Sequence, residues 1–420
     1  MDLVAYAVPF FILAMIVELL WGLRVGRNTY RTNDAVSSLF LGTLSQARRF
    51  VTLGVGGYVY HRVATHMGNA QLDATSPWTW ILAMVLYDFC YYWLHRLGHE
   101  RTLLWAAHVA HHQSEDYNLS TALRQTSTGF LFGWIFYLPM YFAGIPASVV
   151  VTVGSLNLIY QFWVHTRHIG KLGWYEWIFV TPSNHRVHHA QNDRYVDRNY
   201  GGLFIVWDRL FGTFQEELDD EPPIYGIRGP LRSFSPLRAL THIYVDMFRD
   251  AWRARRWRDK LHVWVARTGW RPADVAAADP RPKADLSRFE LFDPVVPAAV
   301  RAYALFQLVA MVALLGLLQF GVASSYGAGV ILVLAMLATT VATSLWLDAR
   351  SPALCLSVEA ARIVILVLVF TAGEGWLELA RGNGFLTSAA LSYLTLNVMA
   401  LILLVVSTMR RRGAARIAGL

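Results

Sequence analysis

The chain has 420 residues, of which 55% are hydrophobic and only 16% are charged. A soluble globular domain carries about a quarter charged residues, so this composition argues against a soluble protein and predicts a membrane protein. The formal net charge of +8 does not indicate a nucleic-acid partner, because the arginines flank apolar runs, where they suit anionic lipid headgroups.

Several apolar segments approach the length of about 20 residues that is needed to cross a bilayer. The first runs from near Met1 to about Leu23; it has no basic n-region and no small-residue cleavage site, so we expect a retained anchor rather than a signal peptide. Residues 34–60 are also apolar but hold Arg48 and Arg49 at their middle, where arginine is costly, so we expect a shorter span or a partly interfacial helix. Further spans are predicted at residues 78–94, 129–143, 147–164, 299–320, 328–347, 355–371 and 386–406.

These segments predict an all-α fold, a polytopic membrane helical bundle with a histidine-rich site. We divide the chain into an N-terminal membrane anchor (residues 1–76), a histidine-rich catalytic domain (77–230), a basic and Pro-rich insert (231–298) and a four-span hydrophobic module (299–420). Lys and Arg favour the cytoplasmic side of a membrane, so the basic stretch at residues 249–260 places the insert and every histidine motif in the cytoplasm. The four spans of this module contain no histidine and almost no charge, and we expect them to lie outside the site.

Most of the 14 histidines lie in four short clusters, which carry the candidate chemistry. The clusters are His95 and His99; His108, His111 and His112; His165 and His168; His185, His188 and His189. Residues three or four apart share one face of a helix, so each cluster directs two or three imidazoles toward one point. Neutral imidazole is a ligand for iron, zinc and copper. One such pair alone is more often an ordinary surface or core feature, but the repetition indicates a metal site.

The three motifs HxxxH, HxxHH and HxxHH supply eight histidines, more than the four ligands of a zinc site, and therefore predict two metal ions. His165 ends an apolar span at the depth of the other clusters, so we expect it to be a ninth ligand that gives one ion five ligands. We expect His168 to be an ordinary interfacial histidine. Asp88 lies two helical turns before His95; a carboxylate inside an apolar span is a functional candidate that can orient a ligating histidine, with hydrogen bonding to a neighbouring tyrosine as the structural alternative.

The three motifs, in this order, resemble those of the fatty acid hydroxylase superfamily of membrane di-iron enzymes, which includes sterol desaturases. The surrounding residues resemble one branch more closely, the alkylglycerol monooxygenases, which cleave ether lipids with tetrahydrobiopterin. The similar stretches are residues 87–96, 99–100, 111–125, 161–166, 181–189, 199–202 and 207–214. In one departure, Asn184 precedes the last motif, where the branch can carry another histidine.

The resemblance implies an O₂-dependent di-iron oxidoreductase that hydroxylates a membrane lipid, with tetrahydrobiopterin as a candidate electron donor. The implied substrate is an alkylglycerol, hydroxylated at the carbon next to the ether oxygen to release a fatty aldehyde. The resemblance matches Glu100 to a position associated with activity, and it assigns iron binding to His95, His99, His108, His111, His112, His185, His188 and His189. Alternatives are a sterol or fatty-acyl hydroxylase or desaturase on the same scaffold, a metal transporter, and an inactive lipid-binding relative.

Overall fold

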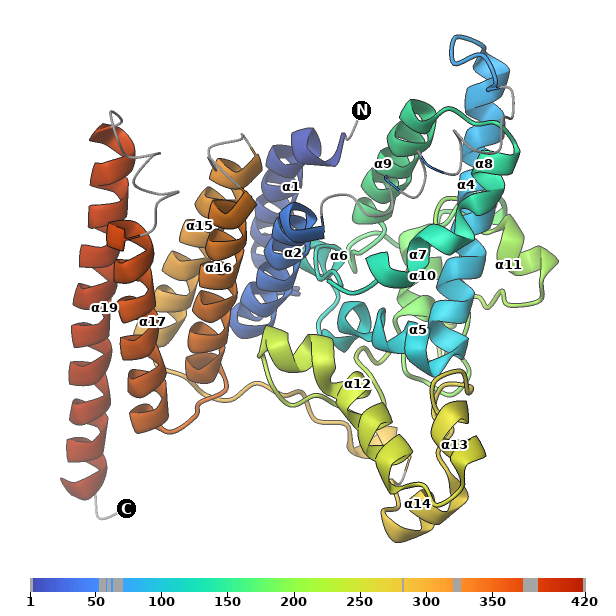
Figure 1. Cartoon of the computed structure of the whole chain (residues 1–420). Helices are drawn as coiled ribbons and strands as arrows, with labels where there is room; N and C mark the ends of the chain where they lie inside the picture. The colour runs from blue at the N-terminus through green and yellow to red at the C-terminus, as the bar shows by residue number, and fades with distance from the viewer. Residues whose placement is uncertain are drawn as a thin grey trace. The chain divides into compact units, whose positions relative to one another are not determined.

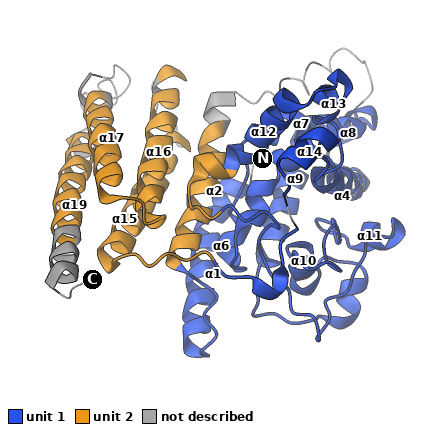
Figure 2. Cartoon of the chain, turned by 90° about the horizontal axis from the view of Figure 1, so that it is seen from below, with its two compact units in different colours: residues 1–31, 54–231, 240–291 blue, residues 32–53, 232–239, 292–420 orange. Residues whose placement is uncertain are grey.

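The computed structural model describes residues 3–52, 58, 62, 71–281, 283–319, 326–372 and 384–417. Within these residues every regular element is an α-helix or a short 3-10 helix (Figure 1), which confirms the all-α prediction. The chain forms two compact units (Figure 2). Unit 1 comprises residues 1–31, 54–231 and 240–291, and unit 2 comprises residues 32–53, 232–239 and 292–420.

The two units do not follow the order of the chain. Helix α2 (Thr32–Thr52) belongs to unit 2, where it packs against α15 (Ala298–Gln319) and α16 (Tyr326–Leu347). The predicted anchor of residues 1–76 instead groups α2 with α1 (Val4–Arg24), which belongs to unit 1. Most of the predicted 34–60 segment beyond Thr52 lies outside the described residues. The predicted boundaries at residues 76, 230 and 298 stay predictions about separately folding parts.

Unit 1 is organised around α1, the long helix α4 (Pro77–Glu100) and α9 (Ala147–Trp163), which packs against both of the others. Gly154 of α9 allows close packing, because a Cβ atom there would lie 2.9 Å from Tyr87 Oη of α4. The remaining elements of this part of the chain are α5 (Thr102–Ala106), η1 (Val109–Gln113), α6 (Leu119–Ala122), α7 (Phe130–Phe136), α8 (Leu138–Phe142), η2 (Gly173–Trp177), α10 (Pro182–His188), α11 (Val206–Leu210), α12 (Pro236–Arg253), α13 (Trp257–His262), α14 (Ala273–Ala278) and η3 (Leu286–Arg288).

The predicted span at residues 129–143 is wrong as a single helix. The structure has α7 followed by α8, with the break between them at Tyr137. Pro139 accounts for the break, because a proline lacks the N–H group that a continuing helix needs and restricts the residue before it. Neither short helix is long enough to cross a bilayer by itself.

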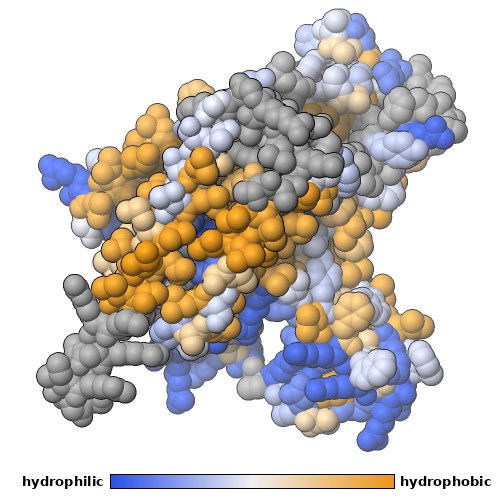
Figure 3. All heavy atoms as spheres, turned by 60° about the vertical axis from the view of Figure 1, so that its left-hand side comes forward, coloured by the Kyte–Doolittle hydropathy of each residue, from blue (hydrophilic) through white to orange (hydrophobic). Residues whose placement is uncertain are grey.

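Four described helices are long and apolar enough to cross a membrane by length and composition, and they identify a multi-pass membrane protein. They are Val4–Arg24, Ala298–Gln319, Gly329–Leu347 and Thr387–Ser407, and all four coincide with predicted spans. Helix α9 is apolar but shorter, and neither α4 nor α17 (Pro352–Ala372) belongs to this set. In Figure 3, which brings the C-terminal helices forward, hydrophobic side chains cover much of the visible face.

A buried polar cluster lies among α15, α17 and α19 (Gly384–Ile417) of unit 2. Arg362 Nε and Glu359 Oε2 of α17 form an ion pair at 2.7 Å, and both side chains are buried. Arg362 also donates to Tyr303 Oη at 2.9 Å and to Asn397 Oδ1 at 2.5 Å, while Tyr303 donates to Glu359 Oε1 at 2.7 Å. The spans of the four-span module, predicted to carry almost no charge, therefore enclose a matched pair of charges between them.

Candidate metal centre

Nine buried or half-buried histidines of unit 1 form two groups, and within each group one ring nitrogen from every histidine lies within 4.8 Å of those of the others. The five-histidine group consists of His95, His99, His108, His112 and His188. The four-histidine group consists of His111, His165, His185 and His189. Together these are the nine residues that the sequence predicts as ligands, and His168 belongs to neither group. The histidine clusters are consistent with a metal site.

The double histidine that ends the second and third motifs serves both groups at once. His111 belongs to the four-histidine group and His112 to the five-histidine group, whereas His188 belongs to the five-histidine group and His189 to the four-histidine group. Consecutive residues on a helical turn point about 100–120° apart, so adjacent histidines cannot converge on one point. The HxxHH spacing therefore brings the two groups next to each other.

Main-chain carbonyl groups orient four of the rings through their Nδ1 atoms. His95 Nδ1 lies 2.8 Å from Tyr200 O, His111 Nδ1 lies 3.0 Å from Arg124 O, and His188 Nδ1 lies 2.9 Å from Arg198 O. His165 Nδ1 lies 2.7 Å from the carbonyl of Gln161, one turn earlier in α9. A carbonyl oxygen can only accept, so each Nδ1 carries the proton and each Nε2 presents a lone pair, as metal ligation requires.

In the described part of the chain, the Nε2 atoms of several rings have either no hydrogen-bonding partner or only another histidine nitrogen nearby. Those of His95, His99 and His188 are buried and have no partner among the described residues. His111 Nε2 and His165 Nε2 lie 3.4 Å apart, although both rings already donate through Nδ1. Two lone pairs facing each other repel, and a cation between them removes the repulsion. The residues present therefore fit a bound metal ion of the kind that imidazole ligates, which includes iron, zinc and copper.

Burial keeps the histidines neutral at physiological pH. Desolvation lowers the pKa of His111 to about 4; the hydrogen bond to the Arg124 carbonyl opposes this shift, and the positive charge of the Arg124 guanidinium adds to it. Desolvation also holds the pKa of His112 well below its usual value, and the neighbouring histidines lower it further. Neutral imidazoles need not lose a proton before they bind a metal ion, so the two groups are prepared for ligation.

Asp88 is fully buried, and its contacts lead away from the histidine rings. Its carboxylate accepts hydrogen bonds from Asn157 Nδ2 at 2.8 Å, from the main-chain N–H groups of Leu203 and Phe204 at 2.7 and 2.9 Å, and from Trp207 Nε1 at 3.0 Å. It thus joins α4 to α9 and to the segment that supplies the Tyr200 carbonyl. The predicted tyrosine partnership is not the one found, and a catalytic role for Asp88 stays a prediction.

We expect the substitution Asp88→Asn to destabilise unit 1 and to lower metal retention. The amide replaces one acceptor oxygen with a donor that faces other donors, and each buried group left unsatisfied costs about 1–3 kcal/mol. Thermal unfolding and metal content of the purified chain measure the two effects. Asp220→Asn is the matched control, because Asp220 is exposed. Unchanged stability and metal content in Asp88→Asn would contradict this structural role.

Glu100, the other predicted catalytic carboxylate, is the last residue of α4. Its Oε1 atom accepts from Arg96 Nε at 2.9 Å, and its side chain is partly exposed. Asn184, the departure from the branch pattern, is the third residue of α10 and exchanges hydrogen bonds with Thr181 in a capping box. The asparagine therefore stabilises the start of the helix that carries the last histidine motif. The catalytic role of Glu100 stays a prediction.

Two further carboxylates position the site, and neither is among the site residues predicted from the sequence. Asp208 accepts from the N–H groups of Tyr200 and Gly201 and from Thr213 Oγ1, each at 2.7 Å, and burial raises its pKa to about 6. Glu18 of α1 accepts from Leu119 N at 2.8 Å and from the hydroxyl of Thr166, the residue after His165, at 2.5 Å. A carboxylate within the first apolar segment was the available signal for Glu18.

Comparisons with known proteins agree with the geometry of the site. A model of the family described as fatty acid hydroxylase matches residues 80–213, which contain all four histidine clusters. Alkylglycerol monooxygenase from Homo sapiens is 41% identical over 275 residues, which cover 64% of this chain and 60% of that protein. The enzyme of the same name from Danio rerio is 37% identical over 303 residues, covering 72% of this chain and 67% of that protein.

More distant relatives act on other lipids by name. An ornithine lipid hydroxylase from Rhizobium tropici is 30% identical over 157 residues, which cover 36% of this chain and 45% of that protein. No solved structure matches the chain significantly. The chain spans about 60% of the length of the alkylglycerol monooxygenase from Homo sapiens. With its histidine clusters and the family match between residues 80 and 213, the chain belongs to the fatty acid hydroxylase family of oxidoreductases.

Proposed function

We propose that the chain is a membrane-bound di-iron monooxygenase that hydroxylates alkylglycerols at the carbon next to the ether oxygen. The observation that carries the proposal is the pair of histidine groups in which ring nitrogens converge on one another, with the Nε2 atoms of His95, His99 and His188 buried and without a hydrogen-bonding partner among the described residues. The identity of 37–41% to alkylglycerol monooxygenases supports the choice of substrate.

The five-histidine group would hold one iron ion and the four-histidine group the other. The bound iron pair would supply the activation of O₂. One oxygen atom enters the C–H bond beside the ether oxygen, and the other leaves as water with two electrons and two protons from a tetrahydropterin donor. The resulting hemiacetal breaks its C–O bond as its hydroxyl proton moves to the glycerol oxygen, which releases a fatty aldehyde and a glycerol.

The protein's own residues orient the ligands and limit the access of water. The carbonyls of Tyr200, Arg124, Arg198 and Gln161 fix the rings that they contact, so the ligand atoms need little rearrangement. Tyr117 is fully buried and packs its ring on His165, with centroids 5.6 Å apart. This apolar cover favours the exclusion of water from an oxidising site.

The proposed orientation places the histidine groups on the cytoplasmic side of the membrane. Arg24, Arg27 and Arg31 follow the apolar residues of α1, and Arg31 forms an ion pair with Asp116, four residues beyond the second histidine motif. Basic residues beside a span favour the cytoplasm. This arrangement places the polar headgroup of a membrane lipid near the site.

A second candidate is a hydroxylase of another lipid class on the same scaffold. A lathosterol oxidase from Homo sapiens is 28% identical over 152 residues, and the ornithine lipid hydroxylase is similarly distant. The identity to these proteins is lower and covers less of the chain than the identity to alkylglycerol monooxygenases, which is why we rank this candidate second.

Product analysis tests the proposal directly. We expect the purified chain to form fatty aldehyde from an alkylglycerol only when O₂, tetrahydrobiopterin and iron are all present, and omission of any one should abolish the product. Aldehyde formation without the pterin would contradict the proposed donor. Hydroxylated sterol or fatty acyl product in place of aldehyde would favour the second candidate, whereas exchangeable zinc or copper without any product would indicate metal transport.

A further inference from the structure

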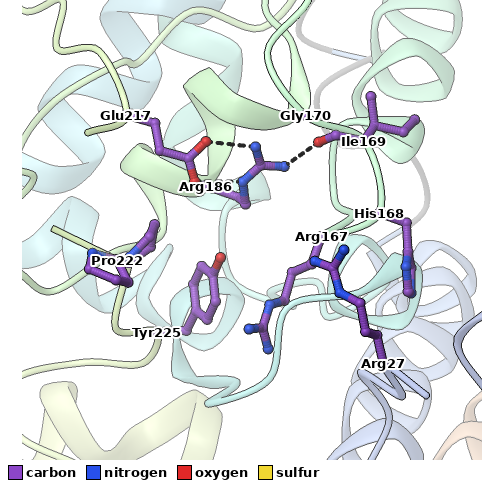
Figure 4. A pocket seen from close by; sticks show the side chains of 10 residues that line it. Arg27, Arg167, His168, Ile169, Gly170, Arg186, Glu217, Pro222 and Tyr225 are labelled. Atoms are coloured by element: carbon purple, nitrogen blue, oxygen red, sulfur yellow. Dashed lines mark hydrogen bonds and ion pairs between the residues drawn. The ribbon is translucent and has the colours of Figure 1, made fainter. Parts of the chain in front are cut away.

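A cavity of about 330 Å³ opens in unit 1 beside the segment that follows His165 (Figure 4). The residues of its lining that bear on its chemistry are Arg27, Arg167, His168, Arg186, Glu217 and Tyr225. Neither the predicted metal ligands nor the proposed reaction uses any of these side chains. Its lining is rich in positive charge.

One arginine of the cavity is fully engaged with the protein. Arg186 Nε donates to Glu217 Oε1 at 2.7 Å, and Arg186 Nη2 donates to Glu217 Oε2 at 2.6 Å, so the two charges are matched. Arg186 Nη1 donates to the carbonyls of Thr166 and Ile169 at 2.9 and 2.7 Å, which fixes the wall of the cavity. The only carboxylate of the lining is therefore already used.

The other two arginines leave the cavity with an unbalanced positive charge. Across the described part of the chain, neither Arg27 nor Arg167 forms an ion pair, and both are exposed. Arg167 instead places its guanidinium carbon 5.8 Å from the ring centroid of Tyr225. Figure 4 shows the side chains of Arg27 and Arg167 between the ring of Tyr225 and the imidazole of His168. Two guanidinium groups that share one cavity favour the binding of an anion.

The cavity lies at the end of a candidate membrane span. Arg27 is three residues beyond α1, and its N–H donates to Gly22 O at 2.8 Å, so the chain folds back onto the end of the helix. The absence of a side chain at Gly22 lets the His168 ring, which lines the cavity, pack closely against α1, because a Cβ at Gly22 would lie 3.3 Å from His168 Nε2. Lipid headgroups occupy the depth at which apolar spans end.

A single aromatic ring separates the cavity from the four-histidine group. Tyr225 stacks on Tyr117 with centroids 4.8 Å apart, and Tyr117 stacks on His165 with centroids 5.6 Å apart. Arg167 is two residues after His165 along the chain. A ligand in the cavity is thus held next to the candidate metal centre.

We infer that this cavity binds the phosphate group of a glycerolipid, with Arg27 and Arg167 as the two cationic contacts. The inference rests on the proposed function and deepens it, since it specifies a phosphate-bearing ether lipid as a substrate. The guanidinium group is planar and presents paired N–H donors, which match two oxygens of a phosphate. A neutral alkylglycerol would leave both arginines unmatched. Free inorganic phosphate offers the same chemistry, but the position at the end of α1 favours a lipid.

Binding measurements on the full-length chain in a phosphate-free maltoside detergent test the site without turnover. The ligands are 1-O-alkylglycerol 3-phosphate, the neutral 1-O-alkylglycerol of equal chain length, and inorganic phosphate, all without O₂ and pterin. We expect Arg27→Gln and Arg167→Gln each to weaken binding of the phosphate lipid about tenfold, the effect of losing one charge-assisted contact. Binding of the neutral lipid should stay within about twofold by the same conversion. Arg24→Gln is the matched control, because Arg24 is exposed on the last turn of α1 and does not line the cavity.

Each outcome has a defined meaning. Equal weakening by Arg24→Gln would show general surface electrostatics and overturn the site. Binding of inorganic phosphate as tight as that of the phosphate lipid would overturn the headgroup assignment, and so would unchanged affinity in both variants. Thermal unfolding of each variant shows whether it is folded. If the phosphate lipid binds as expected but no ether lipid yields aldehyde, the proposed function fails while the site stands. If the wild type and the variants yield equal amounts of aldehyde from both lipids, the site fails while the proposed function stands.

Discussion

Replacing His111 or His189 with alanine is expected to remove metal from the four-histidine group and to abolish turnover. Both residues belong to that group, and each replacement leaves three imidazoles where four converge. We expect the metal content to fall to about half or less, because a site with three remaining ligands holds its ion more weakly. Activity should fall by roughly 100-fold or more, since weaker changes to the surroundings of a metal ligand already cost 10–100-fold.

Metal analysis of purified protein and aldehyde formation measure the two effects. Membrane insertion should be unchanged, because neither histidine lies in an apolar span. His262→Ala is the control, since His262 is exposed on α13 and belongs to neither group. Full iron occupancy with retained turnover in both variants would refute the di-iron assignment.

The substitution Arg362→Met is expected to destabilise unit 2 strongly while leaving the histidine groups loaded. It removes the cation and leaves Glu359 charged and fully buried. Breaking a buried ion pair by removing one partner costs about 3–5 kcal/mol. The double replacement Arg362→Met with Glu359→Leu should recover much of this stability, because no uncompensated charge remains.

Thermal unfolding in detergent measures the loss of stability, and metal analysis measures occupancy. Arg301→Met is the matched control, since Arg301 is exposed at the start of α15. A loss of metal in parallel with stability would contradict the expectation that the four-span module lies outside the site. Wild-type stability in Arg362→Met would show that the polar contacts of Arg362 with Tyr303 and Asn397 do not hold α17 to α15 and α19.

The histidine groups were predictable because their spacing reports on helix geometry. His95 and His99 lie four residues apart, and this separation places them on one face wherever α4 sits. His165 was less certain, since it has no close histidine partner in either group along the chain, and only the folded structure brings it within reach of His111 and His185.

The groups that orient the rings could not be predicted from residue types. Tyr200 contributes its main-chain oxygen to His95, and any residue carries such an oxygen. Asp88 is the residue that the sequence predicts for this task, because a carboxylate is visible in a sequence, whereas a main-chain carbonyl is not. The stretches 199–202 and 207–214, which resemble the alkylglycerol monooxygenases, contact each other: Asp208 accepts from the N–H groups of Tyr200 and Gly201 and so fixes the carbonyl that orients His95. The break between α7 and α8 was visible in advance as Pro139, which the predicted span disregarded.

The use of carbonyl groups to orient the rings has a consequence for how this scaffold diversifies. A mutation of Arg124, Arg198 or Tyr200 changes a side chain but leaves the oxygen that holds a histidine in place. Side chains around the metal centre can therefore drift and acquire new lipid specificities without retuning the ligands. Deletions and insertions are a different matter, because they move the backbone itself. We expect members of such a lineage to vary freely in residue type near the centre while keeping the lengths of the connecting segments nearly constant.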